Sequence, residues 1–184
     1  IIIQPTRGKN IYLDAFPADE VQQIKGLKYF CPIIEENALL KYKDRQAIVK
    51  LKGVDSTYAK MSQMDTLMVQ GHFVLEEKRS NYLVLGYGVA YRLQSRLSDF
   101  YSPINIYLPD KEKKAGTRLE DSFNSIQLYP SGYFSVRQDY DESYAFISFH
   151  LLQETIGNKN QVTSFEIGLE EGASLEEIQD KLKQ

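Results

Sequence analysis

The chain has 184 residues, enough for one good-sized domain or two small lobes, and its hydrophobic content of 42% is ordinary for a globular fold. Its formal net charge is -3, from 22 basic and 25 acidic residues, so it lacks the extended positive field that favours nucleic acid or an anionic membrane. We therefore expect no nucleic-acid partner. The aromatic residues are 13 Tyr and 9 Phe with no Trp, a balance that suits strands and indicates a β-rich mixed fold.

Cys31 is the only cysteine, which rules out an intrachain disulfide, a CxxC redox pair and a thiolate zinc site. Its flanks, residues 29–33, predict a buried strand in which cysteine serves as a small hydrophobe. No segment approaches the roughly 20 apolar residues of a membrane-spanning helix, and no signal peptide is present. Because the chain opens with Ile1-Ile2-Ile3 and no initiator methionine, we interpret it as a piece of a longer protein.

The N-terminal part predicts a strand, a helix and a hairpin. Residues 10–16 can form a strand, and residues 17–26 begin with proline, place acidic residues in the first turn and end at glycine, as short helices do. Residues 29–42 and 46–53 then flank the polar turn Lys43-Asp44-Arg45, and apolar residues alternate along the second segment. This pattern predicts an antiparallel hairpin.

The corner at residues 84–93 is the most distinctive segment of the middle part. An apolar strand runs through Gly86 and Gly88 into a helix, which is how a dinucleotide-binding fingerprint begins. Tyr91 stands where the third glycine of that fingerprint would be needed for close packing. The spacing therefore favours a packing corner that buries Val89, Ala90 and Leu93 over a phosphate-binding loop.

Further strands are predicted at residues 103–108, 125–136 and 144–149, followed by a short helix through residues 151–156. The charged tract at 109–121 lies between apolar strands and is the clearest candidate for an exposed loop or ribbon.

The C-terminal part repeats the order of strand and helix. Residues 162–169 alternate as a strand does, and Ser174 opens a capping box before a helix with Leu175, Ile178 and Leu182 on one face. Strand and helix units therefore occur at both ends of the chain. Packing them side by side would form one α/β lobe and leave the middle of the chain as an inserted lobe.

Candidate catalytic groups are scarce. The two histidines, His72 and His150, have no neighbouring ligand pattern, and adjacent Glu35 and Glu36 on a strand point to opposite faces. The acidic turn at 139–142 lacks the glycine and distal glutamate of a calcium loop, so we interpret it as a solvated turn. We expect no enzymatic activity, no cofactor and no metal site, although a catalytic pair could still be assembled from distant positions.

Short motifs in a fixed order resemble the extracytoplasmic domain of FtsX-like ABC-transporter permeases, the MacB-like periplasmic core domain, and within them the LolC/LolE lipoprotein-releasing type. The resemblance covers nearly the whole chain, and its specificity lies in the order and spacing of the motifs. The motifs are Gly26-Leu27, residues 34–40, Lys52-Gly53-Val54-Asp55, Gly71-His72-Phe73, Val84-Leu85-Gly86 with Val89-Ala90 and Leu93, Gly132-Tyr133-Phe134, Tyr140-Asp141 and Ala145-Phe146-Ile147.

This resemblance implies an α+β fold in two lobes: a porter-like α/β lobe from residues 1–53 and 159–184, and an inserted, β-rich sabre-like lobe from residues 54–158. It also implies a periplasmic domain of an inner-membrane protein, with one membrane span before Ile1 and three after Gln184. The family transmits motion from a separate cytoplasmic ATPase to a substrate or partner outside the membrane. The expected partners are that ATPase subunit through the parent permease, a second permease subunit, and a periplasmic chaperone or lipoprotein.

In lipoprotein-releasing members a hairpin hook recruits the chaperone, and by position that hook would fall within residues 109–124. Its basic residues are our candidate partner contacts, namely Lys111, Lys113, Lys114 and Arg118. Lipoprotein release or a related export task is the leading hypothesis. The alternatives are an FtsX-type regulator of a cell-wall hydrolase and a MacB-like efflux component.

Overall fold

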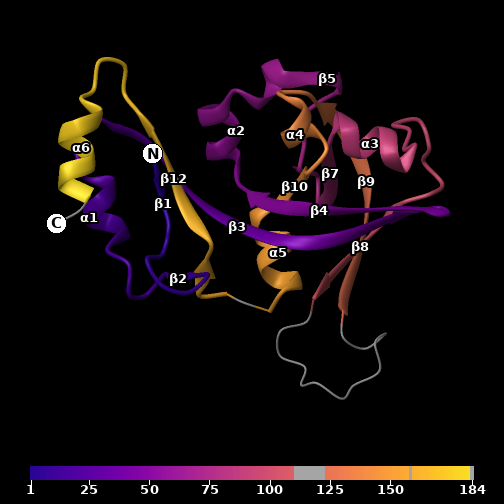
Figure 1. Cartoon of the computed structure of the whole chain (residues 1–184), viewed down its shortest axis with the longest axis horizontal. Coiled ribbons are helices and arrows are strands. Elements are labelled where there is room, and N and C mark those ends of the chain that lie inside the picture. Colours follow the sequence, from indigo (N-terminus) through magenta and orange to yellow (C-terminus); the bar gives the residue numbers. More distant parts are fainter. Residues whose placement is uncertain (110–122, 158, 183–184) are drawn as a thin grey trace.

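The chain folds into one large mixed sheet with short helices packed around it, an α+β architecture (Figure 1). The computed structural model describes residues 1–109, 123–157 and 159–182. The strands are β1 (Ile2–Ile3), β2 (Ile11–Tyr12), β3 (Leu27–Tyr42), β4 (Arg45–Val54), β5 (Met68–Gly71), β6 (Glu76–Glu77), β7 (Ser80–Gly86), β8 (Ile104–Pro109), β9 (Phe123–Phe134), β10 (Tyr144–Ser148), β11 (Gln161–Val162) and β12 (Ser164–Leu169). The helices are α1 (Ala18–Gln22), α2 (Ser56–Ser62), the 3-10 helix η1 (Met64–Leu67), α3 (Tyr87–Leu93), α4 (Gln138–Asp141), α5 (Phe149–Thr155) and α6 (Leu175–Leu182).

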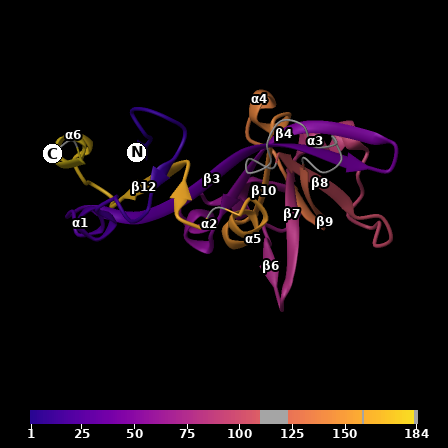
Figure 2. The ribbon, with the colours of Figure 1, turned by 90° about the horizontal axis from the view of Figure 1, so that it is seen from below.

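Six strands pair in a closed ring, in the order β3, β4, β10, β7, β9, β8 and back to β3. The pairs β4 with β10 and β7 with β9 are parallel, and the other four pairs are antiparallel. Strand β5 extends the ring from β9, and β6 forms a short ribbon with β7 (Figure 2). Because consecutive side chains of a strand alternate between faces, one face of each ring strand supplies the core.

Strand β3 is shared between this ring and a smaller group of elements that contains both chain ends. Its residues 27–33 pair with β12, which in turn pairs with β1, whereas residues 34–42 pair with β4. Both termini lie with α1 and α6 at one end of the molecule, and α3 lies at the other (Figure 1). The sheet is therefore continuous from one end of the molecule to the other.

The two-lobe division predicted from the sequence, with boundaries at residues 53 and 159, stays a prediction. The predicted boundary at residue 53 falls within β4, which pairs in register with β3 and β10. Hydrogen bonds of the sheet thus cross the predicted boundary.

Three stacked phenylalanines hold the smaller group together. Phe165 of β12 lies between Phe16 and Phe30, with ring centroids 4.4 and 4.6 Å apart, and its side chain is fully buried. Ring stacking at such distances adds to the free energy gained by burying the apolar surface. Helix α6 adds Ile178, and the hydroxyl of Ser174 accepts a hydrogen bond from the Glu177 backbone amide at 3.3 Å, as the capping pattern predicts.

The ring is filled by aliphatic side chains, and helices α3 and α5 cover it. Leu83, Leu85, Leu93, Ile106 and Leu152 are all fully buried in this core. A second, more aromatic cluster lies under α2 and η1 and includes Phe134, Phe146, Tyr58 and Cys31. The predicted buried strand around Cys31 is confirmed.

Most elements predicted from the sequence are present, with shifted ends. The hairpin of β3 and β4, the corner of β7 and α3, and the C-terminal strand and helix are confirmed. The strand predicted at residues 10–16 is only the two-residue β2, because it pairs solely with the equally short β11. Helix α2 had no counterpart in the prediction, although the Asp55 carboxylate accepts a hydrogen bond from the Tyr58 amide at 2.9 Å and caps it.

Candidate partner-binding surface

The charged tract that supplied the sequence-based candidates lies outside the described residues. Lys111, Lys113, Lys114 and Arg118 all fall within residues 110–122. The strands on either side of the tract are described: β8 and β9 pair from Ile104 with Leu128 to Pro109 with Phe123. The tract thus follows directly on a hydrogen-bonded strand pair, and its role in partner binding stays a proposal.

The corner at β7 and α3 is a packing element, as the missing third glycine predicted. Val89, Ala90 and Leu93 are buried. The backbone of the α4 turn approaches the corner closely, so that a Cβ atom added at Gly86 would collide with the Asp141 carbonyl oxygen. Gly86 is therefore required by the close approach of two backbone segments. The exposed side of α3 carries Tyr87 and Tyr91.

The acidic turn that touches this corner is not solvated throughout, contrary to the sequence-based interpretation. Asp141 is buried at 7% exposure, and its carboxylate accepts hydrogen bonds from the Ser135 hydroxyl at 2.7 Å and the Val136 amide at 2.8 Å. Its charge is thus satisfied by local donors, which is the condition for burying a carboxylate. Asp139 is exposed and pairs with Arg137 at 3.1 Å.

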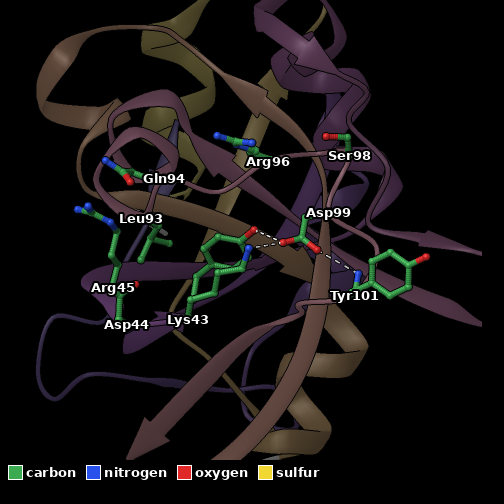
Figure 3. Close-up of a pocket in the computed structure, with 10 residues that line it drawn as sticks. Lys43, Asp44, Arg45, Leu93, Gln94, Arg96, Ser98, Asp99 and Tyr101 are labelled. Carbon is green, nitrogen blue, oxygen red and sulfur yellow. Dashed lines mark hydrogen bonds and ion pairs between the residues drawn. The ribbon is translucent and has the colours of Figure 1, made fainter.

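A hollow of about 440 Å³ lies between the tip of the β3–β4 hairpin and the loop that follows α3 (Figure 3). The hairpin tip and that loop each supply basic and acidic side chains to it. The lining residues are Tyr42, Lys43, Asp44, Arg45, Leu93, Gln94, Arg96, Ser98, Asp99 and Tyr101. Lys43, in the hairpin turn, and Gln94, the C-cap of α3, have φ angles of 55° and 54°, the left-handed conformation that tight hairpin turns and helix ends use.

Asp99 joins the two walls of this hollow. One carboxylate oxygen accepts hydrogen bonds from the Tyr42 hydroxyl at 2.6 Å and the Lys43 ammonium at 2.7 Å, and the other accepts from the backbone amides of Tyr101 and Ser102. The Lys43 ammonium, and then the Tyr42 hydroxyl, hold the pKa of Asp99 well below its usual range. The ionised Asp99 therefore fixes the loop against the hairpin.

A second hollow, of about 360 Å³, continues from the first along α3. The two share Gln94 and Arg96, and the second is also lined by Tyr87 and Tyr91. Tyr133 and Ser95 also line the second hollow, and their hydroxyls lie 2.8 Å apart, within hydrogen-bond distance. We call the continuous surface the arginine–tyrosine groove, defined by Arg45, Tyr87, Tyr91, Gln94, Arg96 and Tyr101.

A buried ion pair connects the ring to the smaller group. The Lys52 ammonium of β4 lies 2.5 Å from a Glu166 carboxylate oxygen of β12 and 3.2 Å from the Tyr58 hydroxyl, with 7% of the lysine side chain exposed. It also lies over the Tyr58 ring, 4.7 Å from the centroid. Burial raises the pKa of Tyr58. Burial also raises the pKa of the nearby Cys31 thiol, to about 12, so both groups stay protonated at neutral pH.

The histidines show no catalytic arrangement within the described part of the chain. His72 is exposed, and His150 is an exposed residue beside a hollow of about 380 Å³ that Asp55 also lines. The Asp55 carboxylate is engaged as the cap of α2. In residues 1–109, 123–157 and 159–182, no group of three or more His, Cys, Asp or Glu side chains could hold a metal ion.

No helix among the described residues combines the length and the apolar composition needed to cross a membrane.

Comparisons by sequence find no matching family model and no matching curated protein. Solved structures, in contrast, share the fold across nearly the whole chain. The extracellular domain of the ABC-type transporter YknZ from Gram-positive bacteria is 16% identical with a TM-score of 0.60, over 98% of this chain and 88% of that one.

Two other solved structures agree with that similarity. The periplasmic region of MacB from Actinobacillus actinomycetemcomitans is 10% identical with a TM-score of 0.66, over 98% of this chain and 78% of that one. A domain of a putative permease protein from Porphyromonas gingivalis is 12% identical with a TM-score of 0.55, over 96% and 70% of the two chains.

This chain thus has the fold of the extracellular and periplasmic domains of ABC-type transporter permeases. The resemblance inferred from the sequence motifs is confirmed at the level of the MacB-like fold. The LolC/LolE subtype stays a proposal.

Proposed function

We propose that this chain is the extracytoplasmic domain of an ABC-transporter permease and that it transmits ATPase-driven motion to a substrate or partner outside the membrane. The observation that carries the proposal is the shared fold, which extends over 98% of the chain in the YknZ and MacB domains. In this role the chain itself is not an enzyme. A separate cytoplasmic ATPase subunit hydrolyses ATP, and a second permease subunit completes the transporter.

The geometry suits the transmission of motion along the molecule. Strand β3 has 16 residues and at the rise of an extended chain is about 50 Å long, so it links the end that carries both termini to the ring. The Lys52–Glu166 pair joins the same two parts a second time. A displacement applied at the termini would therefore be carried to α3 by a hydrogen-bonded sheet and a buried ion pair.

The transport task that we propose is lipoprotein release or a related export process. A MacB-like efflux role and an FtsX-type regulatory role use the same motion and differ in the partner. Isolation of envelope partners with the intact protein and with a variant lacking residues 110–121 separates these tasks. Recovery of a lipoprotein or its carrier supports release, whereas recovery of a cell-wall hydrolase alone contradicts it.

The transmission itself can be measured with spin labels in the parent permease, reconstituted with its ATPase. Ile48 of β4 is 71% exposed and lies outside the arginine–tyrosine groove, whereas Cys31 is fully buried and will not compete for the label. We expect the distance between labels at Ile48→Cys in the two permease subunits to change when ATP binds. An ATPase variant that cannot bind ATP is the control, and identical distances with and without ATP in the active transporter would contradict the proposal.

A further inference from the structure

We propose that the arginine–tyrosine groove binds a segment of a partner protein that carries both acidic and aromatic side chains. This inference deepens the proposed function, because it names the chemistry of the partner on which the domain would act. It rests on three observations: two arginines that form no ion pair among the described residues, exposed aromatic side chains beside them, and a preorganised hollow between them.

The charge of the groove is opposite to that of the chain. Three basic and two acidic residues line the first hollow, on a chain whose net charge is -3. Lys43 is paired with Asp99, whereas in the described part of the chain neither Arg45 nor Arg96 forms an ion pair. A guanidinium binds a carboxylate through two parallel hydrogen bonds, so two unpaired arginines at one hollow are suited to acidic side chains.

Exposed aromatic side chains lie in the groove and beside it. Within the groove, Tyr91 is 78% exposed and Tyr101, in the loop after α3, is 94% exposed. Phe100, next to Tyr101 in the chain, lines neither hollow and is 75% exposed. Tyrosine and arginine are the residue types enriched in the energetically dominant parts of protein interfaces. Covering these rings with aromatic residues of a partner would remove apolar surface from water.

The groove is preorganised, because its walls are fixed by contacts beneath the surface. Asp99 ties the loop to the hairpin, Ser95 contacts Tyr133, and Leu93 is fully buried below. A groove that needs little ordering on binding loses less conformational entropy. Figure 3 shows Arg45, Gln94 and Arg96 around one part of the hollow, with Asp99 between Lys43 and Tyr101.

A protein segment fits this surface better than an anionic membrane does. Membrane attraction requires clusters of about four to eight basic residues, whereas three basic residues line the first hollow. The surface is hollowed in two successive depressions, which suits an inserted chain better than a plane of headgroups. Both chain ends lie at the opposite end of the molecule from α3 (Figure 1).

The test is a fluorescence-polarisation titration of the 184-residue chain with a labelled peptide that contains Glu and Asp together with Phe and Tyr. Control peptides carry Lys in place of the acids, or Ser in place of the aromatic residues. We expect saturable binding of the first peptide that weakens as NaCl is added, and at least about tenfold weaker binding of both controls.

Charge reversal locates the site. The variant Arg45→Glu/Arg96→Glu should weaken binding of the acidic peptide by about tenfold or more. The control variant Arg7→Glu/Arg79→Glu changes the net charge equally, at exposed arginines outside the groove, and should leave the binding unchanged. Circular dichroism establishes that each variant is folded. The proposal is overturned if the peptide does not bind saturably, if both double variants bind it like the parent chain, or if the groove arginines are needed only for binding phosphatidylglycerol vesicles.

These results are independent of the transporter assignment. The titration uses the chain without a membrane or an ATPase. Failure of the peptide to bind would therefore contradict the proposed binding site and leave the proposed transmission of motion unaffected. Unchanged label distances in the reconstituted permease would contradict the proposed transmission of motion and leave the proposed peptide-binding site unaffected.

Discussion

Asp99 is the residue on which the shape of the groove depends most directly. Its carboxylate accepts four hydrogen bonds, from two side chains and two backbone amides. Among the described residues, it is the only side chain that forms hydrogen bonds between the hairpin tip and the loop after α3. The ionised form is the one that these donors favour. The stability that Asp99 provides must therefore depend on pH.

The variant Asp99→Asn should have a lower thermal midpoint than the parent chain at neutral pH. Because the pKa of Asp99 is lowered by folding, its stabilisation is fully present above the pKa of the unfolded state and disappears as the pH falls through the lower pKa of the folded state. The difference in midpoint should thus shrink between about pH 5 and about pH 2. Asp44→Asn, in the same turn, is the control at pH 7 and should leave the midpoint unchanged. A difference for Asp99→Asn that stays constant down to the acid limit would contradict this explanation.

At the scale of elements, the corner of β7 and α3 is held by the close approach of the α4 turn. A Cβ atom at Gly86 would meet three backbone atoms of Asp141 within 3 Å, whereas at Gly88 the nearest atom belongs to the Glu142 side chain, at 2.6 Å. A side chain can move aside more easily than backbone can. The two glycines should therefore differ in their tolerance of alanine.

Gly86→Ala should destabilise the chain by about 2–3 kcal/mol, as overpacking of a tight core does, and Gly88→Ala by about 1 kcal/mol. Urea unfolding followed by circular dichroism measures both values. Equal stability of Gly86→Ala and the parent chain would show that the two backbones do not approach as closely as described.

The Lys52–Glu166 pair joins two elements that the sheet already brings together through β3. Removing one partner leaves the other charge partly buried, so we expect Lys52→Met to lower the free energy of unfolding by about 2–4 kcal/mol. The exposed pair Arg137–Asp139, with side chains 70% and 72% exposed, is the control, and Arg137→Met should cost less than about 1 kcal/mol.

The double variant Lys52→Met/Glu166→Leu tests the pairing itself. Replacing both charges by apolar groups should recover most of the lost stability, because no unpaired charge then remains in the interior. A loss in the double variant equal to the sum of the losses measured for Lys52→Met and for Glu166→Leu alone would contradict a direct interaction between these side chains.

Across the whole molecule, the sequence was most informative where neighbouring residues decide the structure. Alternation and a polar turn predicted the β3–β4 hairpin, and the spacing of Val89, Ala90 and Leu93 predicted the buried face of α3. Contacts between distant residues could not be predicted in the same way. Lys52 and Glu166 are separated by 114 positions, and the arginine–tyrosine groove combines a hairpin tip, a helix and a loop.

Asp141 shows a different reason for a wrong prediction. Its acidic neighbours suggested a solvated turn, but its carboxylate is satisfied by donors only five and six residues earlier, at Val136 and Ser135. The adjacent aromatic residues Phe100 and Tyr101, which directly follow Asp99 in a polar segment, were a signal in the sequence that could have indicated this surface. The basic residues proposed at 111–118 remain candidates, because they lie outside the described residues.

The central claim is that this chain lies outside the cytoplasmic membrane as part of a permease, and labelling in cells tests it most directly. The parent protein carrying Ile48→Cys is treated with a membrane-impermeant maleimide in intact spheroplasts; the unmodified protein is the control, because Cys31 is fully buried and its thiol has a pKa raised to about 12. We predict that Ile48→Cys is labelled without permeabilisation and that Cys31 reacts only after denaturation. Labelling of Ile48→Cys only after the membrane is permeabilised would contradict the claim.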